Sequence, residues 1–360
     1  MKKIIALIIS LTAVLGVLAG CGEYKTGQPG NTTGSATTGP ATTNGGAGTV
    51  SGDSLKTGMA VITSIAKSTD AGEADGLAEV DSTVAAVTVD KDGKIVNCNI
   101  DAAQTKINFS KAGKITTALD TVFKSKQELG TDYGMSKQSG IKKEWNEQAD
   151  AFADYVKGKT VDEVKGIALD EEGKPSDKEL TASVTVHVGD FIAAIEKAAG
   201  NAKDIGAKAG DKLGLGVLTT IAKSADAAAD KDGVAQAYSN YTATTFGADG
   251  KITSCIIDAS QTDVNFSADG KLKTDLKTAF KTKNELGADY GMVKQSGIKK
   301  EWNEQADAFA KYVTGKTVDE AKGVSVNEEG VPTDKELTSS VTIHVTDFIA
   351  VIEKASANAE

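Results

Sequence analysis

The sequence predicts an α+β protein that contains two tandem copies of one domain, and three observations lead to this prediction. A block of 17 residues, KQSGIKKEWNEQADAFA, occupies 137–153 and recurs unchanged at 294–310, 157 positions later. In each copy, residues that alternate around an Asp-Gly pair indicate a β-hairpin. Apolar residues at helical spacing follow, without regular β-α-β alternation, which favours α+β over α/β.

The first 20 residues have the pattern of an export signal. Lys2 and Lys3 precede an apolar run, 4–18, which is too short for a stable membrane span. The run ends in Leu-Ala-Gly-Cys, and this ending resembles the lipobox of bacterial lipoproteins. The resemblance implies cleavage before Cys21 and a diacylglyceryl group on its sulfur. Because two acyl chains hold a protein stably at a bilayer, we expect a lipid-anchored protein on the outer face of the bacterial cell membrane.

The rest of the chain divides into a linker and two repeats. Residues 21–54 are rich in Gly, Thr, Asn and Ala, so they are expected to form a flexible, lipid-anchored linker. The repeats are expected at 55–200 and 212–360, with a joint at 201–211. We expect each repeat to contain its own hydrophobic core.

Composition excludes several classes of partner. Removal of Lys2 and Lys3 with the leader changes the formal net charge from −10 to −12, and the chain contains no Arg. A nucleic-acid partner is therefore excluded, because binding it needs a positive face. Cys98 and Cys255 are the only cysteines after Cys21, so no disulfide framework is expected. Cys98 lies on the apolar face of its strand, which is typical of a core residue.

The first elements of each repeat can be read from local patterns. Residues 83–100 predict a hairpin that turns at Asp92-Gly93. A helix is expected over about 115–129. A second helix is expected over about 141–157, with Trp145 on its apolar stripe.

The last elements of each repeat surround the segment that we interpret as a site. Thr160 and Glu163 form a capping box for a short helix. The alternating residues LTASVTVHV predict a strand over 180–188, and Asp190 is expected to cap a final helix over 191–199.

The predicted strand presents a row of hydroxyls and an imidazole on one face. Its members are Thr181, Ser183, Thr185 and His187 in the first repeat and Thr338, Ser340, Thr342 and His344 in the second. A polar row at a strand-to-helix junction can hold a phosphate, with the backbone N–H groups of the helix start nearby.

The order of these elements resembles the FMN-binding domain of membrane redox-pump subunits and of flavin-bearing lipoproteins. The hairpin AAVTVDKDGKIVNCNID at 85–101 and the end DKELTASVTVHVGDFIAAIEKA at 177–198 carry the resemblance. The family tail reads Asp-x-x-Ser-Gly-Ala-Thr-x-Thr/Ser, and FMN is esterified to the Thr after Ala. The resemblance implies covalent FMN at Ser183 and Ser340, with Thr185 and Thr342 as alternative acceptors. Leu180 and Thr181 depart from the family's Ser and Gly.

Two functions follow from these expectations. The first is a cell-surface lipoprotein that carries flavin for electron transfer outside the membrane and meets redox partner proteins. The alternative is a non-catalytic surface lipoprotein in which two flavin-free copies of the fold bind a small ligand, a partner or the cell wall. An electron carrier or binding protein is favoured over an enzyme that turns over a substrate, because no catalytic triad appears. No metal site is predicted, because the Asp-rich turns at 70–76 and 226–233 lack the Glu that ends a calcium loop.

Overall fold

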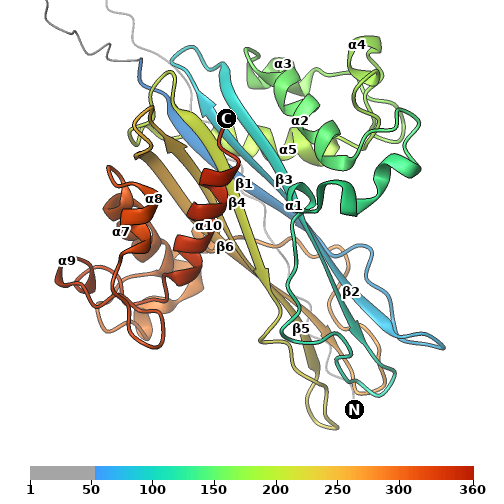
Figure 1. The fold of residues 1–360 in the computed structure, drawn as a ribbon. Helices are drawn as coiled ribbons and strands as arrows, with labels where there is room; N and C mark the ends of the chain where they lie inside the picture. The colour runs from blue at the N-terminus through green and yellow to red at the C-terminus, as the bar shows by residue number, and fades with distance from the viewer. Residues whose placement is uncertain (1–52) are drawn as a thin grey trace, which may run out of the picture. The chain divides into compact units, whose positions relative to one another are not determined.

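Each repeat begins with three antiparallel strands. The computed structural model describes residues 53–360, so the leader, Cys21 and most of the linker lie outside the described residues. The first sheet has the order β1-β2-β3 and the second has the order β4-β5-β6 (Figure 1). The strands are β1 (Lys56–Ser64), β2 (Gly76–Val89), β3 (Ile95–Phe109), β4 (Lys212–Thr220), β5 (Gly233–Phe246) and β6 (Ile252–Phe266). The predicted α+β class with two tandem sheet-helix units is confirmed.

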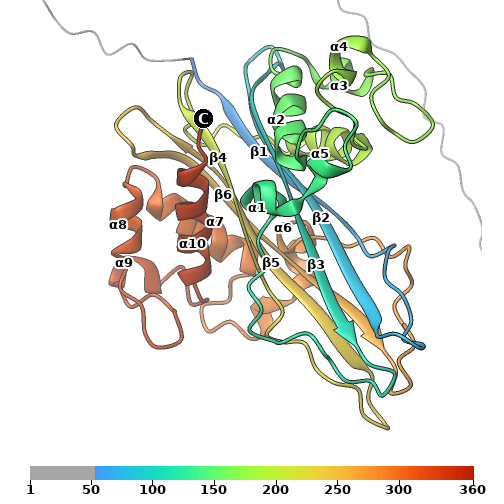
Figure 2. The same ribbon diagram turned by 45° about the vertical axis from the view of Figure 1, so that its right-hand side comes forward.

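Helices follow the strands in each repeat. In the first repeat they are α1 (Lys126–Leu129), α2 (Trp145–Val156), α3 (Val161–Lys165), α4 (Lys178–Thr181) and α5 (Gly189–Gly200). In the second they are α6 (Lys283–Leu286), α7 (Trp302–Val313), α8 (Val318–Lys322), α9 (Lys335–Thr338) and α10 (Thr346–Ala357). Short 3-10 turns follow α1 and α6. The helices of each repeat cover the outer face of its own sheet (Figures 1 and 2).

Three elements confirm predictions made from local sequence. β2 and β3 pair as a hairpin through the turn at Asp92-Gly93, where the Asp90 carboxylate accepts the N–H groups of Asp92 and Lys94. Helix α2 begins at Trp145, which packs edge-on against Phe191 of α5. Thr160 and Glu163 form the expected capping box at the start of α3. These signals succeed because each depends on residues close together in the chain.

The strand predicted over 180–188 is wrong. Helix α4 includes Leu180, the chain then turns, and α5 begins at Gly189, where the N-cap is Val188 rather than the expected Asp190. The Leu180 carbonyl accepts the N–H of Val184, as in a helical turn. Leu180, Val184 and Val188 are buried four residues apart. The alternating valines suggested a pleat, whereas burial follows a four-residue spacing.

The helix predicted over 115–129 is also mostly wrong, because only α1 forms there. The chain that follows β3 folds back on its strand, and the N–H of Thr116 bonds the Asn108 carbonyl. The N–H of Ile115 donates to Asp226 of the other repeat at 2.8 Å. The chain is therefore held in this conformation by a return bond to β3 and by a contact with the second repeat.

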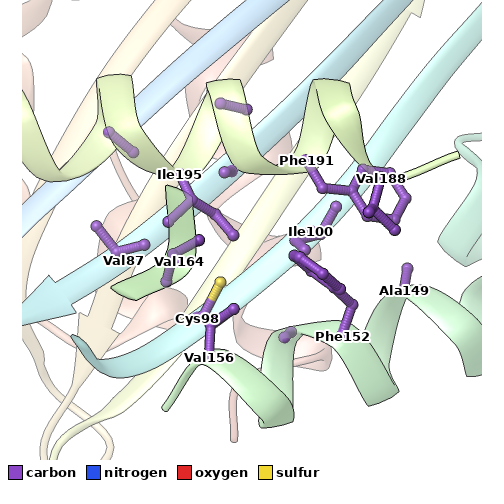
Figure 3. Close-up of a cluster of buried hydrophobic side chains, with 14 of the residues drawn as sticks. Val87, Cys98, Ile100, Ala149, Phe152, Val156, Val164, Val188, Phe191 and Ile195 are labelled. Atoms are coloured by element: carbon purple, nitrogen blue, oxygen red, sulfur yellow. The ribbon is translucent and has the colours of Figure 1, made fainter. Parts of the chain in front are cut away.

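Each repeat has a hydrophobic core between its sheet and its helices. Figure 3 shows this core in the first repeat, where Cys98 of β3 lies among apolar side chains of α2 and α5. Cys255 is buried at the equivalent place in the second repeat. Both thiols are free, and burial raises the pKa of Cys98 to about 12 and that of Cys255 to about 11. Both cysteines are therefore unreactive packing residues, as the sequence predicts for Cys98.

Two further hydrophobic clusters are shared by both repeats, although the sequence predicts only separate cores. One cluster packs the inner faces of the two sheets together and includes Met59 and Val84 of the first with Leu215 and Tyr241 of the second. The other cluster lies at the far ends of the strands. There the rings of Phe109 and Phe266 stack with centroids 4.3 Å apart. Because β2 is covered on both faces, its second half is continuously buried instead of alternating.

The contacts between the repeats follow an approximate two-fold symmetry. Asp70 accepts the N–H of Leu272, and Asp226 accepts the N–H of Ile115, both at 2.8 Å. The ion pair Lys197–Glu285 has its equivalent in Lys354–Glu128. Each repeat therefore meets the other through the same positions, and two equivalent clefts lie between them.

Candidate functional site

The residues predicted to attach a cofactor lie on an irregular segment in the first repeat. The Ser183 hydroxyl is half-buried and donates to the Leu180 carbonyl at 3.2 Å. The Thr185 hydroxyl and N–H both donate to the Gln148 side-chain oxygen, at 3.1 and 2.8 Å. His187 is exposed, and its ring lies against Gly173, where an added Cβ would lie 2.5 Å from Nε2. These three side chains do not share one face.

The second repeat repeats this arrangement. The Ser340 hydroxyl donates to the Leu337 carbonyl at 3.1 Å, and the Thr342 hydroxyl donates to the Gln305 side-chain oxygen at 3.1 Å. The Nδ1 atom of His344 lies 2.7 Å from the Glu329 carbonyl oxygen. Both histidines therefore pack on the loop before their helix rather than beside the serines.

The unchanged 17-residue block has a structural role that the sequence did not reveal. Gln148 is fully buried, and its Nε2 donates to the Lys143 carbonyl while its oxygen holds Thr185. The Glu144 carboxylate accepts the N–H of Met135 at 2.7 Å. The block thus fastens two loops to α2. The Thr185 hydroxyl is therefore engaged in an internal hydrogen bond. Within each repeat, the Ser, Thr and His predicted to bind flavin contact different parts of the chain.

A cavity of about 980 Å³ lies elsewhere, in one of the two clefts between the repeats. We call it the open cleft. The first repeat contributes β1 and the segment 200–205, and the second contributes β6, α6 and α7. Its lining includes Val61, Ile205, Asp258, Asn284, Glu285 and Asp307. The volume falls in the range of small-molecule sites, and the lining combines apolar and acidic side chains.

A buried carboxyl group lies at the base of the open cleft. Asp258 of β6 is 8% exposed and accepts the N–H groups of Ala259 and Asn284, at 2.8 and 3.0 Å. Burial raises the pKa of Asp258 to about 7, because desolvation outweighs these hydrogen bonds. The protonated form of this carboxyl is therefore favoured relative to that of an exposed Asp.

A second carboxylate of the open cleft lacks a partner. Asp307 of α7 makes no hydrogen bond or ion pair with any of residues 53–360, and burial raises its pKa while Lys203 opposes the rise. Asn284 donates its amide to the Ile257 carbonyl at 2.9 Å. The Asn284 oxygen is buried and receives no donor from the described part of the chain. The lining of the cleft thus offers hydrogen-bond acceptors, of which the Asn284 oxygen is buried and the Asp307 carboxylate is exposed.

Longer side chains line the equivalent place beside the first repeat, and we call it the filled cleft. Gln127 stands where the second repeat has Asn284, and its amide donates both to the Ile100 carbonyl, at 3.0 Å, and to Asp150, at 2.7 Å. Lys157 bonds Asp154 at 2.7 Å and lies 3.9 Å from Glu360. The shorter Asn284 and Thr314 occupy these two positions in the open cleft.

An aromatic cage fixes the start of α6 beside the open cleft. Lys283 is 4% exposed, and its Nζ lies 4.5–4.9 Å from the ring centroids of Tyr238, Tyr290 and Trp302. It also donates to the Tyr238 hydroxyl at 2.8 Å. Burial lowers the pKa of Lys283 to about 7, while the aromatic faces favour its charged form. The cage holds the backbone that positions Asn284.

The first repeat has a weaker version of this cage. Lys126 lies over two rings only, those of Tyr133 and Trp145, at 5.0 and 5.2 Å. Asp81 stands where the second repeat has Tyr238, and it pairs with Lys67 instead. The two repeats therefore differ in the aromatic cages beside α1 and α6, the short helices beside the clefts.

The comparisons with known proteins identify no relative. No family model, curated protein or solved structure matches this chain. Within residues 53–360, no helix is long and apolar enough to cross a bilayer, and no group of three or more metal-ligating side chains is found.

Proposed function

We propose that the mature protein is a lipid-anchored binding protein on the outer face of the bacterial membrane, and that the open cleft between its repeats holds a small ligand. The observation that carries this proposal is the 980 Å³ cavity with the buried carboxyl of Asp258 at its base. A buried carboxyl costs stability unless it is compensated. A binding site accounts for its place at the base of a cavity.

The filled cleft supports a role for this cavity. In the equivalent place, two longer side chains stand: Gln127 bonds Ile100 and Asp150 of its own repeat, and Lys157 approaches Glu360 of the other repeat. Two longer side chains are thus compatible with this fold, whereas the second repeat has the shorter Asn284 and Thr314 at these positions. Unfilled volume beside buried polar atoms lowers stability, so an open cleft is favoured where a ligand occupies it.

Native mass spectrometry of protein purified from its host tests the proposal. We expect a non-covalent adduct that is lost on denaturation. We expect it to be absent from the variant Asn284→Gln, in which the longer amide can reach Asp307 and occupy the cleft. Gln127→Asn in the filled cleft is the matched control and should retain the adduct. An adduct that persists in Asn284→Gln would place the ligand elsewhere.

The anchor is proposed on the leader alone, because Cys21 lies outside the described residues. Replacement Cys21→Ala removes the sulfur that would carry the lipid. We expect the variant protein either to leave the membrane fraction or to remain as uncleaved precursor. Correctly cleaved Cys21→Ala protein that stays in the membrane fraction would contradict the lipid anchor.

Covalent FMN for extracytoplasmic electron transfer is the second candidate. One observation favours it. In both repeats the serine hydroxyl is half-buried and makes one hydrogen bond, to a carbonyl oxygen, so its release costs only about 1 kcal/mol. We expect that an esterified protein would gain the mass of FMN less one water per site. Ser183→Ala with Ser340→Ala should abolish this gain. Unmodified mass in host-made protein would remove this candidate and leave the binding protein.

A further inference from the structure

The first repeat shows which group the open cleft lacks. The backbone N–H of Gln127 donates to Asp101 at 3.1 Å, and that of Asn284 donates to Asp258 at 3.0 Å, so the two residues occupy equivalent places. Each side-chain amide also donates to the carbonyl one residue before that Asp. Gln127 and Asn284 therefore make the same two hydrogen bonds in their respective clefts.

The clefts differ in the next hydrogen bond. Gln127 extends one methylene further and delivers its second N–H to Asp150 at 2.7 Å. Asn284 is too short to do the same for Asp307, the equivalent of Asp150. Among the described residues, the exposed carboxylate of Asp307 therefore lacks the N–H donor that Asp150 receives in the first repeat.

The other interior groups also favour a donor. Asp258, Asp307 and the buried oxygen of Asn284 are acceptors, and Glu285 is already paired with Lys197. Lys203 and Lys311 are exposed residues of the cleft, and their long side chains can remain in water. An anionic ligand would meet the carboxylates of Asp258 and Asp307, whereas an N–H donor can bond to them.

We infer that the open cleft selects small molecules that present an amide or amine N–H to the carboxylate of Asp307 and place an apolar body against side chains such as Val61 and Ile205. This inference rests on the proposed function and names its ligand class. In the first repeat, Gln127 occupies the place that the ligand occupies in the second.

A matched set of probes tests the inference on the full mature chain. Benzamide and acetophenone have nearly the same shape, but only benzamide carries N–H donors. Benzylammonium and benzoate add a cation and an anion of similar size. Affinities are measured by titration with ligand-observed NMR at neutral pH. Because a hydrogen bond to a charged group is worth a factor of about ten or more, we expect benzamide to bind about tenfold more tightly than acetophenone. We expect benzoate to bind most weakly.

Two variants separate the inference from the proposed function. Asp307→Ala lies on the exposed face of α7, where Ala is a good helix former, so the fold should be kept. It should remove the preference for benzamide over acetophenone and leave acetophenone binding unchanged. Asn284→Gln should weaken the binding of all four probes.

The outcomes are distinct. Equal affinities of benzamide and acetophenone, a preference that survives Asp307→Ala, or tightest binding of benzoate would overturn the N–H inference, while the cleft would remain a binding site. Binding of no probe, or binding that Asn284→Gln leaves intact, would overturn the proposed site itself. Tighter binding of benzylammonium than of benzamide would support the inference and identify the donor as an amine.

Discussion

The open cleft and the filled cleft are built on equivalent strands and helices, yet they differ in what occupies them. In the filled cleft, Gln127 and Lys157 extend along the wall formed by the first repeat and bond the carboxylates of Asp150 and Asp154. In the open cleft, shorter side chains leave about 980 Å³ and the unpaired Asp307. The comparison teaches that two copies of one fold can differ in side-chain length at the two positions that line each cleft.

The comparison assumes that the two repeats are equivalent away from the clefts, and the stacked phenylalanines test this assumption. Phe109→Ala and Phe266→Ala each remove one ring from the same shared cluster. We expect each to cost about 3–5 kcal/mol of unfolding free energy, because a buried ring leaves a cavity. Urea denaturation measures both. Costs that differ by more than about 1 kcal/mol would show that the repeats do not contribute equally to the frame.

The buried carboxyls at the base of each cleft should differ in their pH dependence. Burial raises the pKa of Asp258 to about 7 and that of Asp101 to about 6, from 3.8. A raised carboxyl pKa means that folding favours the protonated form. Its contribution to stability is complete below about pH 4 and is lost as the pH rises to the folded pKa.

Replacement by Asn should remove this loss of stability. Asp258→Asn should raise stability at pH 8 relative to pH 4 by up to about 4 kcal/mol, and Asp101→Asn by up to about 3 kcal/mol. The stability of the wild type and both variants, measured by urea denaturation between pH 4 and pH 8, gives the difference. A larger effect at Asp101 than at Asp258 would contradict the expected order of the two pKa values.

The smallest effect on stability is expected when the filled cleft is given the two shorter side chains of the open cleft. Gln127→Asn with Lys157→Thr gives the filled cleft the side chains of the open one. We expect a cost of about 1–2 kcal/mol, from one lost hydrogen bond to a carboxylate and an exposed ion pair. The stoichiometry of benzamide binding should rise from one to two per chain. A stoichiometry that stays at one would show that the cavity depends on features beyond these two positions.

Local signals in the sequence were sufficient for part of the fold. The hairpin at Asp92-Gly93 and the capping box at Thr160 each depend on neighbours in the chain, and both were predicted correctly. The segment 180–188 was misread as a strand because its bonding depends on Gln148, 37 residues earlier than Thr185. The chain at 115–125 was misread because it meets Asp226 of the other repeat. Long-range partners of this kind leave no periodic pattern.

The candidate site was even less accessible from the sequence. Aligning the two copies shows that Gln127 corresponds to Asn284 and Lys157 to Thr314. Each change is unremarkable on a polar helix surface. It acquires meaning only when the structure places Gln127 within 2.7 Å of Asp150 across a cleft. The predicted flavin residues stood out because Ser, Thr and His are chemically distinctive, whereas the cleft uses ordinary amides and carboxylates.

The two-fold pairing of Asp70 with Leu272 and of Asp226 with Ile115 has a genetic consequence. In a dimer of single repeats, one gene would encode both clefts, and any mutation that filled one would fill the other. Covalent duplication removes this constraint. Each half of the chain can then mutate independently, so side chains can fill one cleft while the other cleft stays open. The symmetry of the contacts preserves the architecture, and the joint at 201–211 allows the halves to diverge.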